Sequence, residues 1–366
     1  MIMSKTSDVI VIGGGIIGMS IAIDLKLQGI SVTVCNKNFP QSASPAAAGM
    51  LAPYAEKLLP GPLLDLCLKS RWLYPNWIQK IQNFTNLDLR YEHCGSLAPV
   101  YDISQNRVSQ NSVGQWLDEK SIHLYQPGLG SDVKGGWLYP DDGQVDNRQL
   151  LHGIYQVART LGVDIKNEVA VHSLLSKRNK IIGISTNKGK FEASTYIVAG
   201  GAWINKFLIV PVRPLKGQML AVKMPKQYLL QKILYGTQVY LVPRKNRNLI
   251  IGATSEDIGW TSGNSSKGIE KLIKESIKLF PDIVNWPIQE FWWGYRPVTP
   301  DKLPILGYYN YDNLIVATGH YRNGILLAPI TASLISELVI NKRNDPLLRN
   351  FSGDRFKNES FSLQHL

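Results

Sequence analysis

The chain has 366 residues and carries 40 Lys and Arg against 28 Asp and Glu, a net charge of +12. Its length allows a large core and two domains. Its three cysteines show no metal-ligand spacing, which argues against a metal centre and a disulfide framework and fits a reducing compartment. No apolar run could span a membrane, and the basic residues form no recognisable nucleic-acid module. We therefore expect a cytoplasmic protein without a nucleic-acid partner.

The first element in chain order is a buried strand that runs into a glycine-rich turn. Residues 9–12 are apolar and β-branched, and Gly13, Gly15 and Gly18 follow with the spacing G-x-G-x-x-G. A helical pattern comes next, and residues 31–35 predict a second strand. This βαβ context predicts a dinucleotide site whose phosphates lie on the helix N-terminus.

The end of the second strand departs from the usual dinucleotide pattern. An acidic residue normally binds the ribose there, whereas this chain has Asn36 followed by Lys37. Asparagine can still exchange hydrogen bonds with a ribose, but without charge. The neighbouring lysine leaves a 2′-phosphate, and hence NADP, open at this point.

The rest of the chain indicates an α/β protein in two parts. Buried-strand patterns at 196–199 and 314–319 and helical patterns at 63–83, 143–161 and 325–338 extend the nucleotide domain. Short strands between 211 and 254 predict an interposed mixed or antiparallel substrate-binding sheet. The expected fold is thus a Rossmann-like domain with this second sheet domain. The expected bounds are 1–85, 140–210 and 295–350 for the nucleotide domain, 86–139 and 211–294 for the substrate domain, and 351–366 for a C-terminal tail.

Two arginines stand in glycine-rich turns late in the chain. Arg296 lies within residues 294–301, and Arg322 within residues 318–325. A guanidinium can grip a carboxylate through two parallel hydrogen bonds. Both arginines could instead be solvated surface residues, and the pair alone does not decide between these interpretations.

Several motifs, taken in order, resemble the D-amino-acid-oxidase and glycine-oxidase family of flavoenzymes over nearly the whole chain. They are GGGIIG at 13–18, SPAAAGMLAP at 44–53, YLVPR at 240–244 with IIGATSE at 250–256, YRPVTPDKLPILG at 295–307 and GHYRNGILLAP at 319–329. The glycine oxidases of thiamine biosynthesis are the most similar branch. The resemblance implies FAD rather than NADP, and a homo-oligomer. Covalent flavin attachment through a late cysteine is excluded, because no cysteine follows Cys94.

The resemblance also implies which residues bind FAD, and the strand-to-glycine junction at Gly200 adds one more. Members of the family usually have Glu where this chain has Asn36. The expected cofactor residues are Gly13, Gly15, Ile16, Gly18, Asn36, Lys37, Ala43, Ser44, Ala48, Gly49, Met50, Val171, Gly200, His320, Tyr321, Arg322, Asn323, Gly324, Ile325 and Leu326.

For the substrate, the resemblance implies that Arg296 binds a carboxylate, that Tyr240 assists it and that Arg322 lies close by, where it stabilises negative charge on the reduced flavin. Met50 would also line the pocket. Gln238 and Ser255 stand where the family can have histidine and methionine. Because serine is smaller than methionine, we expect a pocket that admits more than glycine.

The implied reaction is oxidation of glycine to the imine or 2-oxo acid, with reduction of O2 to H2O2; sarcosine and small D-amino acids are further candidate substrates. The imine would serve the thiazole of thiamine, with a thiazole synthase as acceptor. The substrate must react as the free amine, and no general base is assigned. A D-amino-acid dehydrogenase that reduces a quinone, a sarcosine oxidase and a flavin-binding subunit without turnover are the alternatives.

Overall fold

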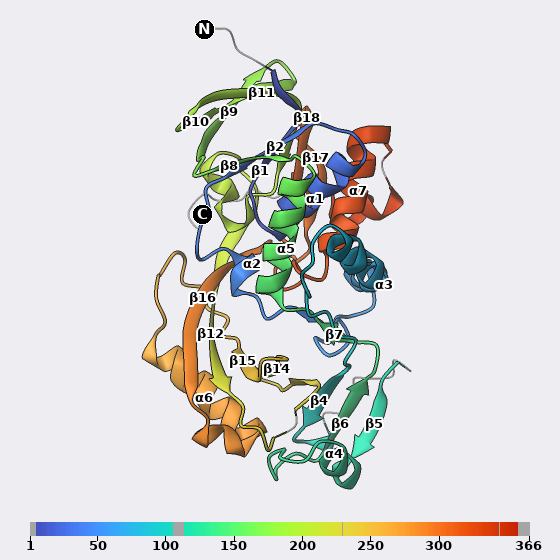
Figure 1. The fold of residues 1–366 in the computed structure, drawn as a ribbon, viewed down its shortest axis with the longest axis vertical. Coiled ribbons are helices and arrows are strands. Elements are labelled where there is room, and N and C mark those ends of the chain that lie inside the picture. The colour runs from blue at the N-terminus through green and yellow to red at the C-terminus, as the bar shows by residue number, and fades with distance from the viewer. Residues whose placement is uncertain (1–4, 105–112, 229, 344, 358–366) are drawn as a thin grey trace.

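The computed structural model describes residues 5–104, 113–228, 230–343 and 345–357. Within these ranges two eight-stranded sheets follow one another along the long axis of the molecule (Figure 1). A small ribbon of β3 (Met50–Leu51) and β7 (Gly143–Gln144) lies between them.

The first sheet has the strand order β17-β18-β11-β1-β2-β8, and β10 and β9 extend it from β11. β1 pairs in parallel with β2 and β11, and β11 in parallel with β18. The Rossmann-like α/β sheet predicted from the sequence is confirmed. Its strands are β1 (Lys5–Ile12), β2 (Val32–Asn36), β8 (Asp164–Asn167), β9 (Val171–Lys177), β10 (Lys180–Thr186), β11 (Gly189–Val198), β17 (Ile305–Tyr309) and β18 (Tyr311–Thr318).

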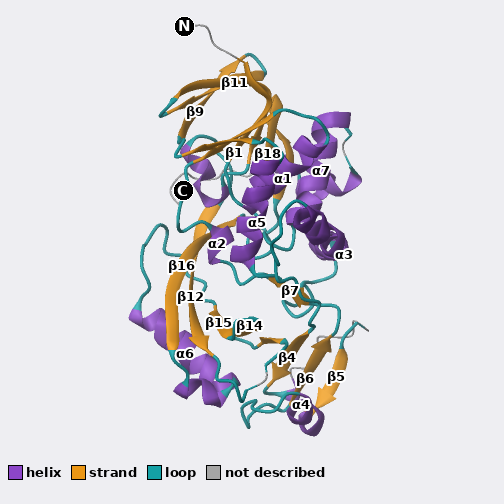
Figure 2. Ribbon diagram, viewed as in Figure 1, coloured by secondary structure: helices purple, strands orange, loops and turns teal. Residues whose placement is uncertain are grey.

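Both faces of the central strands are covered. Val9 and Val11 face a core shared with α1 (Ile16–Leu27), α3 (Pro62–Asn83), α5 (Asn147–Thr160) and α7 (Ala328–Asn341). Figure 2 shows these four helices gathered on one side of the sheet. Ile10 and Ile12 point the other way, into a core with the β9–β10 layer. Because strand side chains alternate, a continuous apolar run suits a strand buried on both faces.

The second sheet has the order β16-β12-β15-β14-β13-β4-β6-β5. Its neighbours are antiparallel except β13 and β4, which are parallel, so the predicted mixed sheet is confirmed. Helices α4 (Glu119–Tyr125) and α6 (Ser266–Leu279) pack on it through apolar side chains. The strands are β4 (Ser96–Val100), β5 (Gln115–Asp118), β6 (Gly135–Tyr139), β12 (Arg213–Lys223), β13 (Ile233–Tyr235), β14 (Tyr240–Pro243), β15 (Asn248–Gly252) and β16 (Ile288–Val298).

One strand crosses the expected domain boundary at 294/295. β16 pairs with β12 from Ile288 to Val298 without a break at that point. Beyond it, Tyr295 forms a bridge to Ser42, and its N–H donates to the carbonyl of Gln41 at 3.0 Å. The division into two domains therefore stays a prediction, and β16 reaches from one part to the other.

The expected C-terminal tail begins as packed structure. Residues Pro346–Phe351 and Gly353–Phe356 form 3₁₀ turns, and Phe351 and Phe356 are buried. Residues 358–366 lie outside the described part of the chain.

Arg244, directly after β14, ties the second sheet to the segments around β3 and β7. Its Nη2 donates to the carbonyl of Ala48 at 2.6 Å. Its Nη1 donates to Gln144 Oε1 at 2.9 Å and to the carbonyl of Val145 at 3.3 Å. One side chain thus satisfies acceptors from two distant parts of the sequence.

We predict that Arg244→Met lowers the free energy of unfolding by about 2–4 kcal/mol, because it leaves these acceptors without their charged donor. Lys245→Met is the control, since Lys245 is exposed and its ion pairs lie at the surface, with Asp88 at 3.4 Å and Glu92 at 4.0 Å; its effect should stay below about 0.5 kcal/mol. Denaturant unfolding measures both. Equal stability of the two variants would contradict the role of Arg244.

Candidate active site

Two adjoining cavities occupy the space between the sheets. The first, of about 590 Å³, lies at the ends of β1 and β2. The second, of about 260 Å³, lies over β12, β14 and β16. They are continuous, because five residues line both: Ile16, Ala43, Ser44, Tyr321 and Gly324.

The glycine-rich turn shapes the first cavity. Gly13 has φ +117°, and a Cβ there would lie 2.3 Å from the carbonyl oxygen of Ala199. A Cβ on Gly18 would lie 2.0 Å from the carbonyl oxygen of Gly13, so helix α1 packs directly on the turn. Gly15 precedes the first residue of α1, whose first turn contains no acidic residue. The free N–H groups of this helix end therefore favour an anion.

The residues expected near the ribose and adenine also line the first cavity. They include Asn36, Lys37, Val171 and Gly200. Asn36 Oδ1 already accepts from the N–H of Asn38 at 3.0 Å. The Asn36 side chain therefore stabilises the turn at Asn38 and also faces the cavity. A carboxylate at this position could accept the same hydrogen bond and would add a negative charge.

The small-residue loop that follows lines the second cavity. Ala43, Ser44, Ala48, Gly49 and Met50 all contribute to its wall, from α2 (Ala43–Ala46) to β3. Ser44 Oγ accepts from the N–H of Ile16 at 3.1 Å, which joins this loop to the start of α1. Because most of these side chains are short, the backbone itself forms the cavity wall. A flat ring system could lie against such a wall.

Arg296 enters the second cavity from β16. Its guanidinium lies against β12, because a Cβ on Gly217 would meet its Nη1 at 2.4 Å. The Nη1 donates to the carbonyl of Thr254 at 3.0 Å. Glycine at position 217 is thus what lets Arg296 lie flat on the strand.

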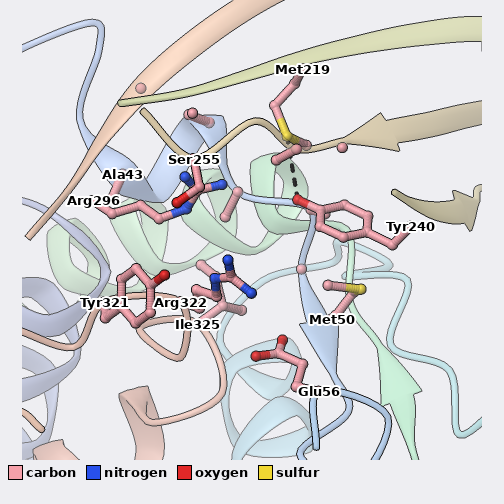
Figure 3. A pocket seen from close by; sticks show the side chains of 18 of the residues that line it. Ala43, Met50, Glu56, Met219, Tyr240, Ser255, Arg296, Tyr321, Arg322 and Ile325 are labelled. Carbon is pink, nitrogen blue, oxygen red and sulfur yellow. Dashed lines mark hydrogen bonds between the residues drawn. The ribbon is translucent and has the colours of Figure 1, made fainter. Parts of the chain in front are cut away.

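Tyr240 and Arg322 face the same space as Arg296 (Figure 3). The Tyr240 hydroxyl donates to Met219 Sδ at 3.3 Å, a weak acceptor that a ligand can replace. Burial raises the pKa of Tyr240, so the phenol stays neutral. Gln238 and Ser255 are exposed residues at the edge of this cavity.

The segment from His320 to Leu326 borders both cavities. His320, Tyr321, Arg322, Gly324 and Ile325 line one or the other. Burial lowers the pKa of His320 to about 3, and its Nε2 lies 3.1 Å from Thr331 Oγ1, so this ring is neutral.

Three of the expected cofactor residues, Gly18, Asn323 and Leu326, line neither cavity in the described part of the chain. Gly18 instead packs on the backbone of Gly13. The N–H of Asn323 donates to the carbonyl of His320 at 2.9 Å, and the carbonyl of Leu326 accepts from Ser70 Oγ at 2.6 Å. They shape the turn rather than present side chains to the cavity.

Glu56 is the residue that the sequence analysis missed. It lines the second cavity and points into it from the side opposite Arg296 (Figure 3). Burial raises the pKa of its carboxyl to about 7, against the opposing effect of Arg322. The available signal was a single acidic residue, which follows the SPAAAGMLAP motif after Tyr54 and Ala55.

These features fit FAD. A helix end that favours anions opens a long cavity, and a small-residue loop leads from it to a chamber bordered by two arginines. A nucleotide turn joined to a reaction chamber of this kind defines a flavin-dependent oxidoreductase. The chain belongs to the FAD dependent oxidoreductase family, whose model matches residues 8–338.

Similar proteins agree with this assignment. The chain is 50% identical over 360 residues to the bifunctional protein ThiO/ThiG of Synechocystis sp., which covers 97% of this chain and 55% of that protein. It is 31% identical over 366 residues to the glycine oxidase of Bacillus subtilis, covering 96% and 98%. The crystal structure of glycine oxidase from Geobacillus kaustophilus matches with a TM-score of 0.90 at 31% identity, covering 95% and 98%. The chain thus spans about half the length of the ThiO/ThiG relatives.

Two features are absent from the described ranges. No helix there combines the length and apolarity that a bilayer crossing needs. The same ranges contain no cluster of three or more His, Cys, Asp or Glu arranged to hold a metal ion.

We predict that Gly13→Ala yields protein without bound flavin, because the added Cβ collides with the backbone at Ala199 and distorts the phosphate turn. Gly29→Ala is the matched control. Gly29 also has positive φ, +82°, but a Cβ there meets nothing within 4 Å. Both variants carry the backbone strain of alanine at positive φ, so the difference in flavin absorbance per chain isolates the collision. Normal flavin content in Gly13→Ala would contradict this.

Proposed function

We propose that the protein is an FAD-dependent amine oxidase that converts glycine to its imine, or after hydrolysis to the 2-oxo acid, while O2 is reduced to H2O2. The observation that carries this proposal is Arg296, held flat over Gly217 beside the small-residue loop, with Tyr240 facing the same space. A small chamber with one forked cation suits a small amino acid bound by its carboxylate.

In this proposal the chain binds and orients the substrate. Arg296 receives the carboxylate, and the Tyr240 hydroxyl turns from Met219 to assist it. Both groups fix the α-carbon toward the small-residue loop, and such orientation contributes several kcal/mol to the rate. When bound, FAD supplies the hydride acceptor and passes the electrons to O2. Arg322 stabilises negative charge nearby.

We include sarcosine and small D-amino acids among the substrates. Ser255 and Gln238 are exposed at the edge of the chamber and leave it open on that side. A side chain on the substrate α-carbon, or a methyl group on its nitrogen, would find room there.

We also propose a partner and a location. The Synechocystis relative is named as bifunctional, ThiO/ThiG, which supports the transfer of the imine to a thiazole synthase. We propose that the protein works in the cytoplasm as a homo-oligomer, as the family resemblance implies.

The proposed function is tested by O2 uptake and H2O2 release from the purified yellow protein with glycine, sarcosine, D-alanine and D-proline. Turnover led by glycine supports the proposal. Preference for a bulkier D-amino acid would mean that the cavity accepts larger substrates through the opening at Ser255. Flavin reduction without O2 uptake would make the protein a dehydrogenase and overturn the oxidase proposal.

We predict that Arg296→Ala lowers kcat/KM for glycine by about 100-fold or more, mainly through KM, because a charge-assisted pair with the carboxylate is lost. Arg159→Ala, at an exposed position on α5, is the control and should leave both constants unchanged. Steady-state O2 uptake gives the two constants. An unchanged KM in Arg296→Ala would remove this residue from carboxylate binding.

A further inference from the structure

Groups of opposite charge border the second cavity, with Arg296 and Glu56 on opposite sides and Arg322 between them (Figure 3). Arg296 and Arg322 contribute positive charge, and Glu56 contributes a carboxyl group from below (Figure 3). An amino acid in neutral water carries both charges, a carboxylate and an ammonium. A chamber with a cation on one side and a carboxylate on the other matches that pattern.

The backbone of Glu56 is held firmly, while its side chain is left to the cavity. Its N–H donates to the carbonyl of Ala52 at 3.0 Å. The preceding N–H, of Ala55, donates to Asp142 Oδ2 at 3.4 Å, and Asp142 is in turn fixed by Arg71 at 2.9 Å. No hydrogen bond joins the Glu56 carboxyl to the other side chains drawn around the cavity. The backbone of Glu56 is therefore fixed, while its carboxyl group forms no hydrogen bond with the side chains drawn in Figure 3.

The groups around Glu56 set its acidity. Burial is the main cause that raises its pKa, Arg322 and Arg296 oppose the rise and Asp142 adds to it, and together these effects leave the pKa at about 7. The pKa of the Asp142 carboxyl is itself raised by burial, to about 6. The ionisable groups that face Glu56 are Arg296 on β16, Arg322 after β18, Asp142 before β7, Cys67 on α3, Tyr235 on β13 and Tyr240 on β14.

The other candidates for a base near neutral pH are unsuitable. Burial raises the pKa of Tyr235 and Tyr240, so neither phenol ionises in the working range. Lys271, at the edge of the cavity, and the two arginines are cations. The His320 ring lines the first cavity and lies against Thr331. Among the described residues that line the second cavity, only Glu56 is a carboxylic acid.

We propose that Glu56 is a catalytic residue that takes a proton from the ammonium group of the bound amino acid. An N–H bond of the substrate breaks, an O–H bond forms on the Glu56 carboxylate, and the nitrogen lone pair is freed. The free amine is the form that can release a hydride from the α-carbon. The proton leaves to solvent with the product. This inference rests on the proposed oxidation of amino acids, because that reaction needs the substrate amine to lose a proton and the inference makes Glu56 the acceptor of that proton.

The test is the pH dependence of flavin reduction by glycine in the absence of O2, in the wild type and in Glu56→Gln. In the wild type the apparent second-order rate constant should rise with pH up to about 7 and then level off, because the ionised carboxylate is the acceptor. In Glu56→Gln the constant at pH 7 should fall by about 100-fold or more. It should then keep rising with pH beyond 7, as the substrate loses its own proton in solution.

Acetate binding to the same flavoproteins provides a readout that requires no turnover. Acetate has a carboxylate but no ammonium, so an ionised Glu56 should repel it. Its affinity, followed by the flavin spectrum, should fall in the wild type as pH rises through about 7. It should stay nearly constant in Glu56→Gln. Asp65→Asn, at an exposed position on α3, is the control and should behave as the wild type does.

The outcomes separate this inference from the proposed function. No flavin reduction of the wild type by any amino acid would overturn both. Normal reduction with the same pH profile in wild type and Glu56→Gln would overturn the role of Glu56 alone. If Glu56→Gln loses its flavin, Glu56→Asp decides. If the rise of the rate constant with pH moves to a different pH in Glu56→Asp, the proposal is supported, because the shorter side chain places the carboxyl in a different environment. If the rise stays at the wild-type pH, the proposal is overturned.

Discussion

The pairing of β12 with β16 is the constraint on which the rest of the site depends. Ten residue pairs register the two strands from Arg213 and Val298 at one end to Val222 and Ile288 at the other. This pairing places Gly217 beneath the Arg296 guanidinium, and carries Tyr295 to its bridge with Ser42. A register shift of one residue would turn Arg296 to the opposite face of the sheet. The first and second cavities are therefore aligned by one long antiparallel ladder.

Charge is the second organising feature of the chamber. Two arginines and one carboxyl group border a partly desolvated space, where each charge influences the others more strongly than in water. Burial raises the pKa of Tyr235 and Tyr240, so these two phenols stay neutral and contribute no charge. A zwitterionic ligand would complete this arrangement, since each of its charges has a counterpart on the wall.

Local patterns were enough to predict the βαβ unit, the glycine-rich turn and some strands of each sheet, because the periodicity and the turn residues lie close together in the sequence. The long strand β16 was not among the predicted strands. The motifs also pointed to Arg296 and Tyr240, which the structure places around one cavity. Glu56, Gly217 and Arg244 were missed for a common reason. Their importance comes from contacts with residues far away in the chain, such as the bond from Arg244 to Ala48. The expected domain boundary at 294/295 falls inside β16. Sequence patterns show where the composition changes, but they do not show which strands pair with each other.

The strand order of the first sheet has a consequence for the folding of the protein. β1 has β2 and β11 as its neighbours, and β11 in turn borders β18, which ends at Thr318. The wall formed by Tyr321 and Gly324 comes later still. During synthesis the glycine-rich turn emerges roughly three hundred residues before Tyr321 and Gly324, which complete the wall of its cavity. Contacts of such long sequence separation form slowly, so the cofactor can stabilise this fold only after those residues have emerged.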